Sequence, residues 1–156
     1  MSDEEPDNPG VVEPPPFLFL GTLAAGLLLD RAIPLPFVPK ALSRIAGTAS
    51  LLCGVASFSW AFATMKRAGT NVDVAEPATT IVEDGPFAYS RNPIYLGLAL
   101  TFAGIATLSR APITIGLLAP LLIVMERGVI EREERYLEKK FGDAYLAYKS
   151  RVRRWA

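Results

Sequence analysis

Four stretches of apolar residues divide the chain, and polar or proline-containing segments separate them. The longest stretch, residues 45–65, has twenty-one residues without a charged side chain, which is long enough for a helix to cross a bilayer. Two later stretches, residues 94–108 and 111–125, are separated only by Ser109 and Arg110, so they predict an antiparallel helical hairpin. The pattern as a whole predicts an all-α protein.

The first apolar stretch, residues 17–29, is the shortest. Thirteen helical residues rise only about 20 Å, against a hydrocarbon core of about 30 Å. We therefore expect this helix to cross a membrane only with help from its flanks, over about residues 17–31. The acidic and proline-rich residues 1–16 lack the basic start of a secretory signal and predict a disordered lead-in.

These elements predict an integral membrane helical bundle with about four transmembrane helices and a single domain over residues 17–156. The predicted spans are residues 17–31, 43–65, 93–109 and 112–127. A polar loop, residues 68–92, and two C-terminal helices, residues 128–141 and 144–153, lie outside them. A soluble helical bundle is the alternative, but it would have to bury four all-round apolar helices in a chain of 156 residues.

Small residues recur along the second predicted span. Ala46, Ser50 and Gly54 are spaced by four and predict a face that a neighbouring helix approaches closely. Cys53, in the same stretch, is the single cysteine and has no partner for an intrachain disulfide. We expect it to be a small core residue.

Charge is concentrated at the ends of the chain, although the total is zero. Residues 1–13 carry five acids and no base, whereas residues 127–156 carry nine bases and five acids. Together with Lys66 and Arg67 at the end of the second span, this distribution predicts both termini on the cytoplasmic side of a bacterial cytoplasmic membrane. The balanced total gives no indication of a nucleic-acid partner. The basic and aromatic tail is suited to the lipid interface through Arg151, Arg153, Arg154 and Trp155.

The chain contains no histidine. This excludes Ser-His-Asp and Cys-His nucleophiles, HExxH zinc sites and histidine-ligated haem. A single cysteine cannot supply a thiolate cluster. We therefore expect no metal site, and any chemistry has to proceed without imidazole.

A first candidate site lies where the third span begins. Asn92 in the N-cap position and Pro93 in the first turn leave the next two amides without an intrahelical acceptor. With Arg91 beside them, these donors predict a site for a carboxylate or phosphate. The alternative is an ordinary capped helix whose Arg91 extends to the lipid headgroups.

A second candidate site lies on the helix after the fourth span. Glu134 interrupts an apolar stripe, and Glu133 is its neighbour; the stripe consists of Ile130, Leu137, Phe141 and Tyr145. A carboxylate on a packing face requires a partner, and a bound cationic ligand is one candidate. Pairing with nearby bases is the alternative, through Arg127, Arg132 or Lys139.

Two blocks of sequence resemble the small integral-membrane methyltransferases, the family that includes isoprenylcysteine carboxyl methyltransferase and the phospholipid methyltransferases. The first block is IVEDGPFAYSRNPIYLG, residues 81–97, and the second is EREERYLEKKFGDAYLAYKSRVRRW, residues 131–155. The first resembles the loop-to-helix segment that ends in Arg-His/Asn-Pro-x-Tyr. The second resembles the glutamate pair followed by the Phe-Gly-x-x-Tyr-x-x-Tyr tail. The resemblance covers about residues 79–155.

The resemblance implies that S-adenosylmethionine binds on the cytoplasmic side, between the loop, the start of the third span and the helix with the glutamate pair. It further implies a lipid-like or small hydrophobic methyl acceptor that arrives from the membrane lipids. Arg91 and Asn92 would anchor the carboxylate or adenosine end, Tyr95 would line the pocket, and Glu133 and Glu134 would bind polar groups of the cofactor. The implied cofactor-binding set is Arg91, Asn92, Pro93, Tyr95, Leu96, Glu133 and Glu134.

No residue is assigned a catalytic role, because a sulfonium is already an activated methyl donor and its transfer needs alignment and desolvation. Asn92 departs from the many family members that have histidine there; it keeps a hydrogen bond but cannot titrate. Two other functions stay open. One is a non-enzymatic membrane scaffold, and the other is an NADPH-dependent membrane reductase, which would need a basic site for the 2′-phosphate.

Overall fold

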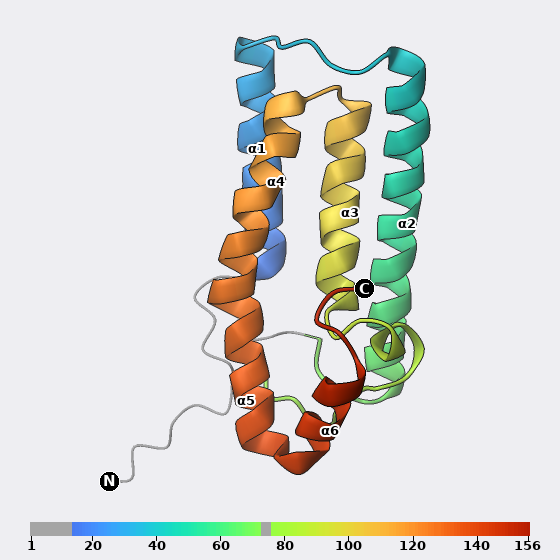
Figure 1. Ribbon diagram of the computed structural model, residues 1–156, viewed down its shortest axis with the longest axis vertical. Helices are drawn as coiled ribbons and strands as arrows, with labels where there is room; N and C mark the ends of the chain where they lie inside the picture. Colours follow the sequence, from blue (N-terminus) through green and yellow to red (C-terminus); the bar gives the residue numbers. More distant parts are fainter. Residues whose placement is uncertain (1–13, 73–75) are drawn as a thin grey trace, which may run out of the picture.

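The computed structural model describes residues 14–72 and 76–156, and these form six α-helices and no strand. Four helices lie side by side: α1 (Pro15–Ala32), α2 (Lys40–Arg67), α3 (Pro93–Leu108) and α4 (Pro112–Met125) (Figure 1). Helix α5 (Glu131–Phe141) continues α4 beyond the bundle, and α6 (Asp143–Arg151) turns back beneath it. The predicted all-α helical bundle is confirmed.

Helix α2 (Lys40–Arg67) is longer than the predicted span 43–65, and α1 also begins before its predicted start. Residues 15 and 16 were predicted to belong to a disordered lead-in, but Pro15 and Pro16 form the first turn of α1. Proline is tolerated there because the first amides of a helix have no intrahelical acceptor. The predicted lead-in over residues 1–13 lies outside the described residues.

Helix α2 packs against α3 along a stripe of small residues. The stripe alternates steps of four and three and consists of Ser43, Gly47, Ser50, Gly54, Ser57 and Ala61. Ala46, which the predicted spacing of four placed on this face, is exposed instead. A helix has 3.6 residues per turn, so a strict spacing of four drifts around its surface, whereas alternating steps stay on one face.

The two backbones approach closely along this stripe. A Cβ added to Gly54 would lie 2.5 Å from the Thr101 amide nitrogen, and one added to Gly97 would lie 2.7 Å from the Phe58 amide nitrogen. Hydroxyl groups of α2 donate to carbonyl oxygens of α3, from Ser50 Oγ to Leu100 at 2.8 Å and from Ser57 Oγ to Pro93 at 3.0 Å. Glycine on both helices therefore fixes the position of α3 relative to α2.

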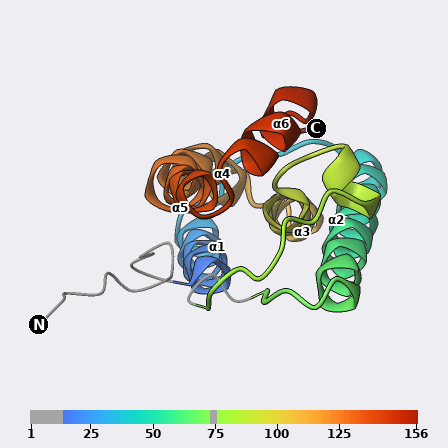
Figure 2. The same ribbon diagram turned by 90° about the horizontal axis from the view of Figure 1, so that it is seen from below.

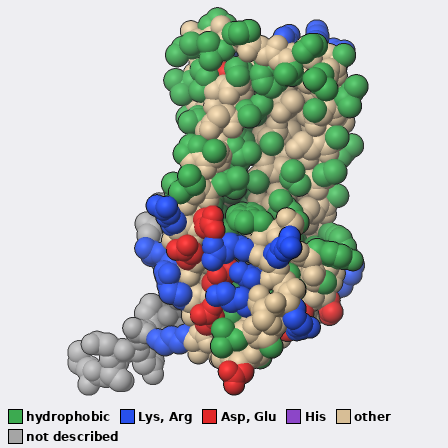
Figure 3. Space-filling model, in the orientation of Figure 1, with side chains coloured by type: hydrophobic (Ala, Val, Ile, Leu, Met, Phe, Trp, Pro, Cys, Tyr) green, Lys and Arg blue, Asp and Glu red, His purple; other side chains and the backbone are tan. Residues whose placement is uncertain are grey.

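Apolar side chains are spread over the face of the bundle that Figure 3 shows, and charged side chains gather below it. Two helical stretches, Lys40–Arg67 and Pro112–Phe141, are long and apolar enough to cross a membrane, and only 17% and 28% of their apolar windows are buried in the protein. Leu52, Val55 and Trp60 on α2 are about half exposed or more. Cys53 also lies on this exposed face, so its predicted burial in the core is wrong. Such a surface requires an apolar surrounding, and the protein is a membrane protein.

Asp30 connects α1 to the start of α4 at the end of the bundle opposite the 68–92 loop. Its carboxylate oxygens accept hydrogen bonds from the Ile113 amide at 3.0 Å, and from the Thr114 amide and hydroxyl at 2.9 and 2.6 Å. These amides belong to the first turn of α4 and have no intrahelical acceptor. Asp30, which interrupts the first apolar stretch in the sequence, thus caps a different helix.

A π-helical turn, Glu126–Ile130, joins α4 to α5. The sequence predicted an uninterrupted helix here, because nothing in its apolar spacing marks one additional residue per turn. A π-helical turn inserts about one residue, so the side chains that follow it are shifted by about 100° around the helix axis. Its buried residues Val129 and Ile130 belong to the main core, together with Phe19, Tyr95, Phe102, Leu121 and Met125.

A test of the close α2–α3 contact compares two glycine-to-alanine substitutions. Gly54→Ala places its Cβ against the α3 backbone and should lower the free energy of unfolding by about 1–3 kcal/mol. Gly116→Ala, on an exposed face of α4 with nothing within 4 Å of the added Cβ, should be neutral or slightly stabilising. Thermal unfolding followed by circular dichroism in detergent measures both. Equal stability of the two variants would contradict the described packing.

Candidate cofactor cavity

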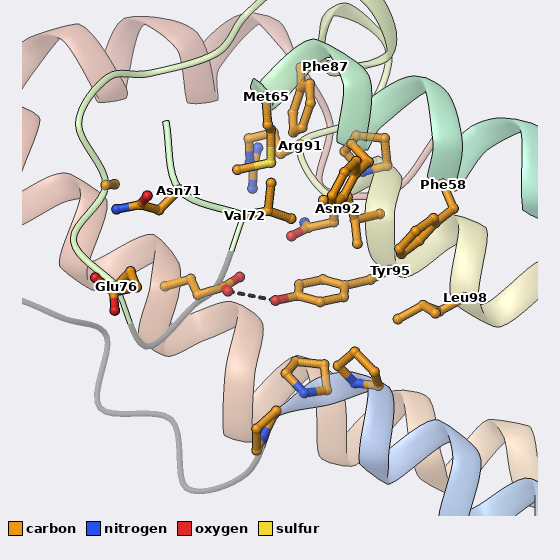
Figure 4. A pocket seen from close by; sticks show the side chains of 18 of the residues that line it. Phe58, Met65, Asn71, Val72, Glu76, Phe87, Arg91, Asn92, Tyr95 and Leu98 are labelled. Carbon is orange, nitrogen blue, oxygen red and sulfur yellow. Dashed lines mark hydrogen bonds between the residues drawn. The ribbon is translucent and has the colours of Figure 1, made fainter. Parts of the chain in front are cut away.

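A cavity of about 570 Å³ lies where the start of α1, α2, the start of α3, α5 and the 68–92 loop meet (Figure 4). Its volume lies within the range typical of small-molecule sites. One part of the wall is apolar and includes Pro15, Pro16, Phe58, Phe62, Ile94 and Leu98. Another part is polar and includes Asn71, Glu76, Arg91, Asn92, Tyr95 and Glu133. The cavity can therefore accommodate a ligand with both polar and apolar parts.

A smaller cavity of about 120 Å³ shares part of this wall. Arg91, Asn92 and Glu133 line both cavities, and the smaller one is completed by Glu134 together with Tyr145 and Tyr148 of α6. The hydroxyl group of Tyr148 donates to the Phe87 carbonyl at 2.8 Å, which connects α6 to the short helix η1 (Gly85–Ala88) of the loop. The loop, α5 and α6 thus enclose one end of the site.

Glu133 is the carboxylate of α5 that faces the larger cavity. Tyr95 on α3 donates a hydrogen bond from its hydroxyl to Glu133 Oε1 at 2.6 Å (Figure 4). Burial raises the pKa of Glu133 to about 7, and the neighbouring charge of Glu134 acts in the same direction, against the lowering effect of the Tyr95 hydrogen bond. The pKa of Glu133 therefore lies near neutral pH, well above that of an ordinary glutamate.

Glu134 lies in a buried ion cluster. Its side chain is 7% exposed, and Arg91 Nη2 lies 2.7 Å from its Oε1. Arg154 contacts both carboxylate oxygens, from Nε at 3.0 Å and from Nη2 at 2.8 Å. Burial alone would raise the pKa of Glu134, but the hydrogen bonds from Arg154 and Arg91 outweigh it and hold that pKa below its usual range. Glu134 is consequently ionised at neutral pH.

Part of the C-terminal segment, which was predicted to lie at the lipid interface, packs against the rest of the protein. Arg154 reaches Glu134 and also contacts Glu126 with Nη1, and Trp155 packs against the main core. Arg151 and Arg153 remain exposed. The number of basic residues does not show which of them point into the protein and which point outward. That depends on the side of the segment that each residue occupies.

Three consecutive residues before α3 hold this segment in place. The Arg91 amide donates to the Arg153 carbonyl at 2.9 Å, and Arg91 Nη1 donates to the Val152 carbonyl at 2.7 Å. Ser90 Oγ and Asn92 Nδ2 both donate to the Arg154 carbonyl at 3.1 Å. Asn92 is the N-cap residue of α3, but its side chain does not cap the helix. The Arg91 and Asn92 side chains, which the sequence assigned to an anionic ligand, thus form hydrogen bonds within the protein.

The structure brings most of the predicted site residues together. Arg91, Asn92, Pro93, Tyr95 and Glu133 line the larger cavity, and Glu134 lines the smaller one. Leu96 lines neither. It follows Tyr95 on α3, and successive helical residues point about 100° apart. The bases expected to pair with the acids in the alternative interpretation were Arg127, Arg132 and Lys139, whereas Glu134 is paired with Arg91 and Arg154.

Several lining residues were not identified from the sequence. Phe58, Phe62 and Met65 on α2 are spaced by four and three, as one helical face requires, but an apolar stripe within an apolar helix carries no distinct signal. Tyr136 on α5 also lines the cavity, and its hydroxyl group accepts a hydrogen bond from the Ala78 amide of the loop at 3.2 Å. Only the folded loop reveals this contact.

Comparison with known proteins identifies the family. A sequence model of the phospholipid methyltransferase family matches residues 42–144, about two thirds of the chain. The chain belongs to the phospholipid methyltransferase family. Members of this family use S-adenosylmethionine as methyl donor. The matched region includes the start of α3 and all of α5, whereas α1 and the segment with Arg154 lie outside it.

A second comparison finds a short relative. Over 34 residues the chain is 56% identical to an uncharacterized protein of Haemophilus influenzae, a match that covers 22% of this chain and 54% of the relative. The match thus spans about half the length of that curated relative. No solved structure matches the chain.

A test of the ion cluster compares an arginine inside it with an arginine of an exposed ion pair. Arg91→Met removes a partner of buried Glu134 and should lower the free energy of unfolding by about 3 kcal/mol. Arg151→Met breaks a pair with Glu83 in which the arginine is 65% exposed, and such a surface pair is worth about 1 kcal/mol or less. Thermal unfolding in detergent measures the stability, and limited trypsin digestion at Arg153 reports release of the segment. If the two variants behave alike, the cluster does not hold the segment.

Proposed function

We propose that the protein transfers a methyl group from S-adenosylmethionine to a lipid-like acceptor at the membrane surface. The cavity between the start of α3 and α5 is the observation that carries the proposal. It lies between the two blocks that the family resemblance rests on, and it combines a carboxylate with an apolar wall. The identity of the family supports the reaction class.

The residues of the cavity fit this cofactor. S-adenosylmethionine has a sulfonium and an ammonium group, and Glu133 offers a carboxylate that neither Arg91 nor Arg154 neutralises directly. An adenine ring requires apolar and aromatic walls, and Phe58, Phe87 and Tyr95 line the cavity. The volume of about 570 Å³ leaves room for the reactive end of an acceptor beside the cofactor.

The cofactor supplies an activated methyl group, so the protein has to bind and orient the two reactants and exclude water. In this proposal Glu133 faces the positive groups of the cofactor, and Tyr95 holds the Glu133 carboxylate in position. Asn92 and Tyr95 line the pocket. Arg91 and Glu134 pair with each other and act as its wall, which replaces the direct cofactor contacts that the resemblance implied for them.

The acceptor is proposed to arrive from the bilayer along the apolar part of the wall. Phe62 lines the cavity from α2 and is 37% exposed, and Leu98 lines the cavity from α3. Helix α1 packs on α4 and α3, whereas α2 packs on α3, and seen from below α1 and α2 stand apart (Figure 2). Residues of both helices line the cavity, so this side is the proposed path for the apolar chain of the acceptor.

We further propose that all four bundle helices cross the membrane. Helix α1 has eighteen residues and α3 sixteen, which correspond to about 27 and 24 Å of rise and approach the thickness of the hydrocarbon core. Lys66, Arg67 and the basic C-terminal helices lie at the end that contains the cavity (Figure 1). An excess of basic residues favours the cytoplasmic side, so the cavity and both termini are assigned to it.

A calorimetric titration tests this proposal, with S-adenosylhomocysteine as ligand and the purified protein in mild detergent. If an ionised Glu133 is needed to bind the ligand ammonium, affinity should fall about tenfold from pH 8 to pH 6, because the pKa of Glu133 is about 7. Glu133→Gln should bind at least tenfold more weakly at pH 8 and lose this pH dependence.

Glu131→Gln is the matched control, since it makes the same change on the same helix at a residue that lines neither cavity. It should bind like the wild type. Absence of binding by a folded, monodisperse wild-type protein at any pH would contradict the proposed function and favour a scaffold protein of the same family.

A further inference from the structure

Arg154 connects the two sides of the cavity. Its side chain lies between Glu126 in the π-helical turn and Glu134 on α5, and its carbonyl oxygen accepts hydrogen bonds from Ser90 and Asn92 before α3. One residue therefore contacts the π-helical turn, α5 and the start of α3. It lies outside the region that matches the family, so membership of the family assigns it no role.

We propose that Arg154 is a positioning residue that sets the ionisation and orientation of Glu133, the carboxylate that faces the cofactor in the proposed function. The inference rests on that function. Arg154 does not line the cavity and acts through Glu134, the neighbour of Glu133 in the chain.

The geometry supports control of orientation. Arg154 contacts both oxygens of Glu134 in a forked arrangement, at 3.0 and 2.8 Å, which fixes the carboxylate more strictly than a single contact would. Because Glu133 is the preceding residue on the same helix, this contact also fixes the direction in which Glu133 projects. The hydrogen bond of 2.6 Å from Tyr95 then holds the Glu133 carboxylate from the other side.

The charges support control of ionisation. The charge of Glu134 raises the pKa of Glu133, and Arg154 neutralises part of that charge. Loss of the Arg154 charge would leave Glu134 less compensated and raise the pKa of Glu133 further. Lys149 Nζ lies 3.8 Å from Glu134 and Arg91 lies 2.7 Å from it, so some compensation remains. The other titratable groups that line the two cavities with Glu133 are Glu76 of the loop, Tyr95 of α3, Tyr136 of α5, and Tyr145 and Tyr148 of α6.

The backbone contacts of residue 154 do not depend on its side chain. A substitution therefore removes the charge while the bonds from Ser90 and Asn92 to the carbonyl oxygen remain available. Arg154→Met is the test variant, Arg154→Lys keeps the charge without the forked contact, and Arg153→Met is the control at an exposed position of the same segment.

The experiment measures the affinity for S-adenosylhomocysteine between pH 6 and pH 9 in detergent. It also follows the protonation of Glu133 in the ligand-free protein by infrared difference spectroscopy, with Glu133→Gln used to assign the band. In Arg154→Met the pH midpoint of ligand binding and the pH midpoint of Glu133 protonation should both move up by about half to one pH unit. Binding should then be several-fold weaker at pH 7 and recover at pH 9. Arg154→Lys and Arg153→Met should keep the wild-type midpoints.

Unchanged midpoints in Arg154→Met would overturn the inference, whether or not its affinity falls equally at every pH, since a uniform loss indicates a purely structural role. If Arg154→Met does not fold, the Arg154→Lys variant decides: a midpoint more than about half a unit from the wild type would contradict control by charge. No binding by the wild type at any pH would contradict the proposed function instead, and the infrared midpoints would still test Arg154.

Discussion

The ion cluster of Arg91, Glu134 and Arg154, in which Arg91 and Glu134 are largely buried and Arg154 is half-buried, is the interaction on which the rest of the site depends. It joins the start of α3, helix α5 and the C-terminal segment, which are separated by twenty to more than forty residues in the sequence. Desolvated charges of this kind add little net stability compared with apolar packing, but removing one partner is costly because the others remain buried. The cluster therefore specifies one arrangement of three segments, and that arrangement encloses the cavity.

A second constraint acts within the membrane-facing part of the protein. Lipid provides no hydrophobic driving force between helices, so α2 and α3 associate through close backbone contact and serine hydrogen bonds. This contact fixes α3, whose first turn presents Tyr95 to the cavity. The π-helical turn then orients α5 so that Glu133 faces the cavity and Glu134 faces the ion cluster. Two neighbouring carboxylates thus acquire different ionisation from different surroundings.

The sequence predicted the helices, the polar loop and the two regions that meet at the cavity, because length, apolar periodicity and proline placement are local properties. It did not predict which side chains pair with each other. Arg91 and Glu134 were each assigned to a ligand, since a sequence shows an isolated arginine and an isolated carboxylate but not that they lie 2.7 Å apart. The role of Arg154 and the exposure of Cys53 likewise depend on which face turns inward. The stripe on α2 was placed one residue off at Ala46 because a spacing of four only approximates the helical repeat.

The structure divides the residues of the two sequence blocks into those that face the cavity and those that build its wall. A structure of the protein with bound S-adenosylhomocysteine would distinguish the two groups. Glu133 should lie within hydrogen-bond distance of the ligand while Arg91 stays paired with Glu134. A complex in which Arg91 has left Glu134 to bind the ligand carboxylate would contradict this division.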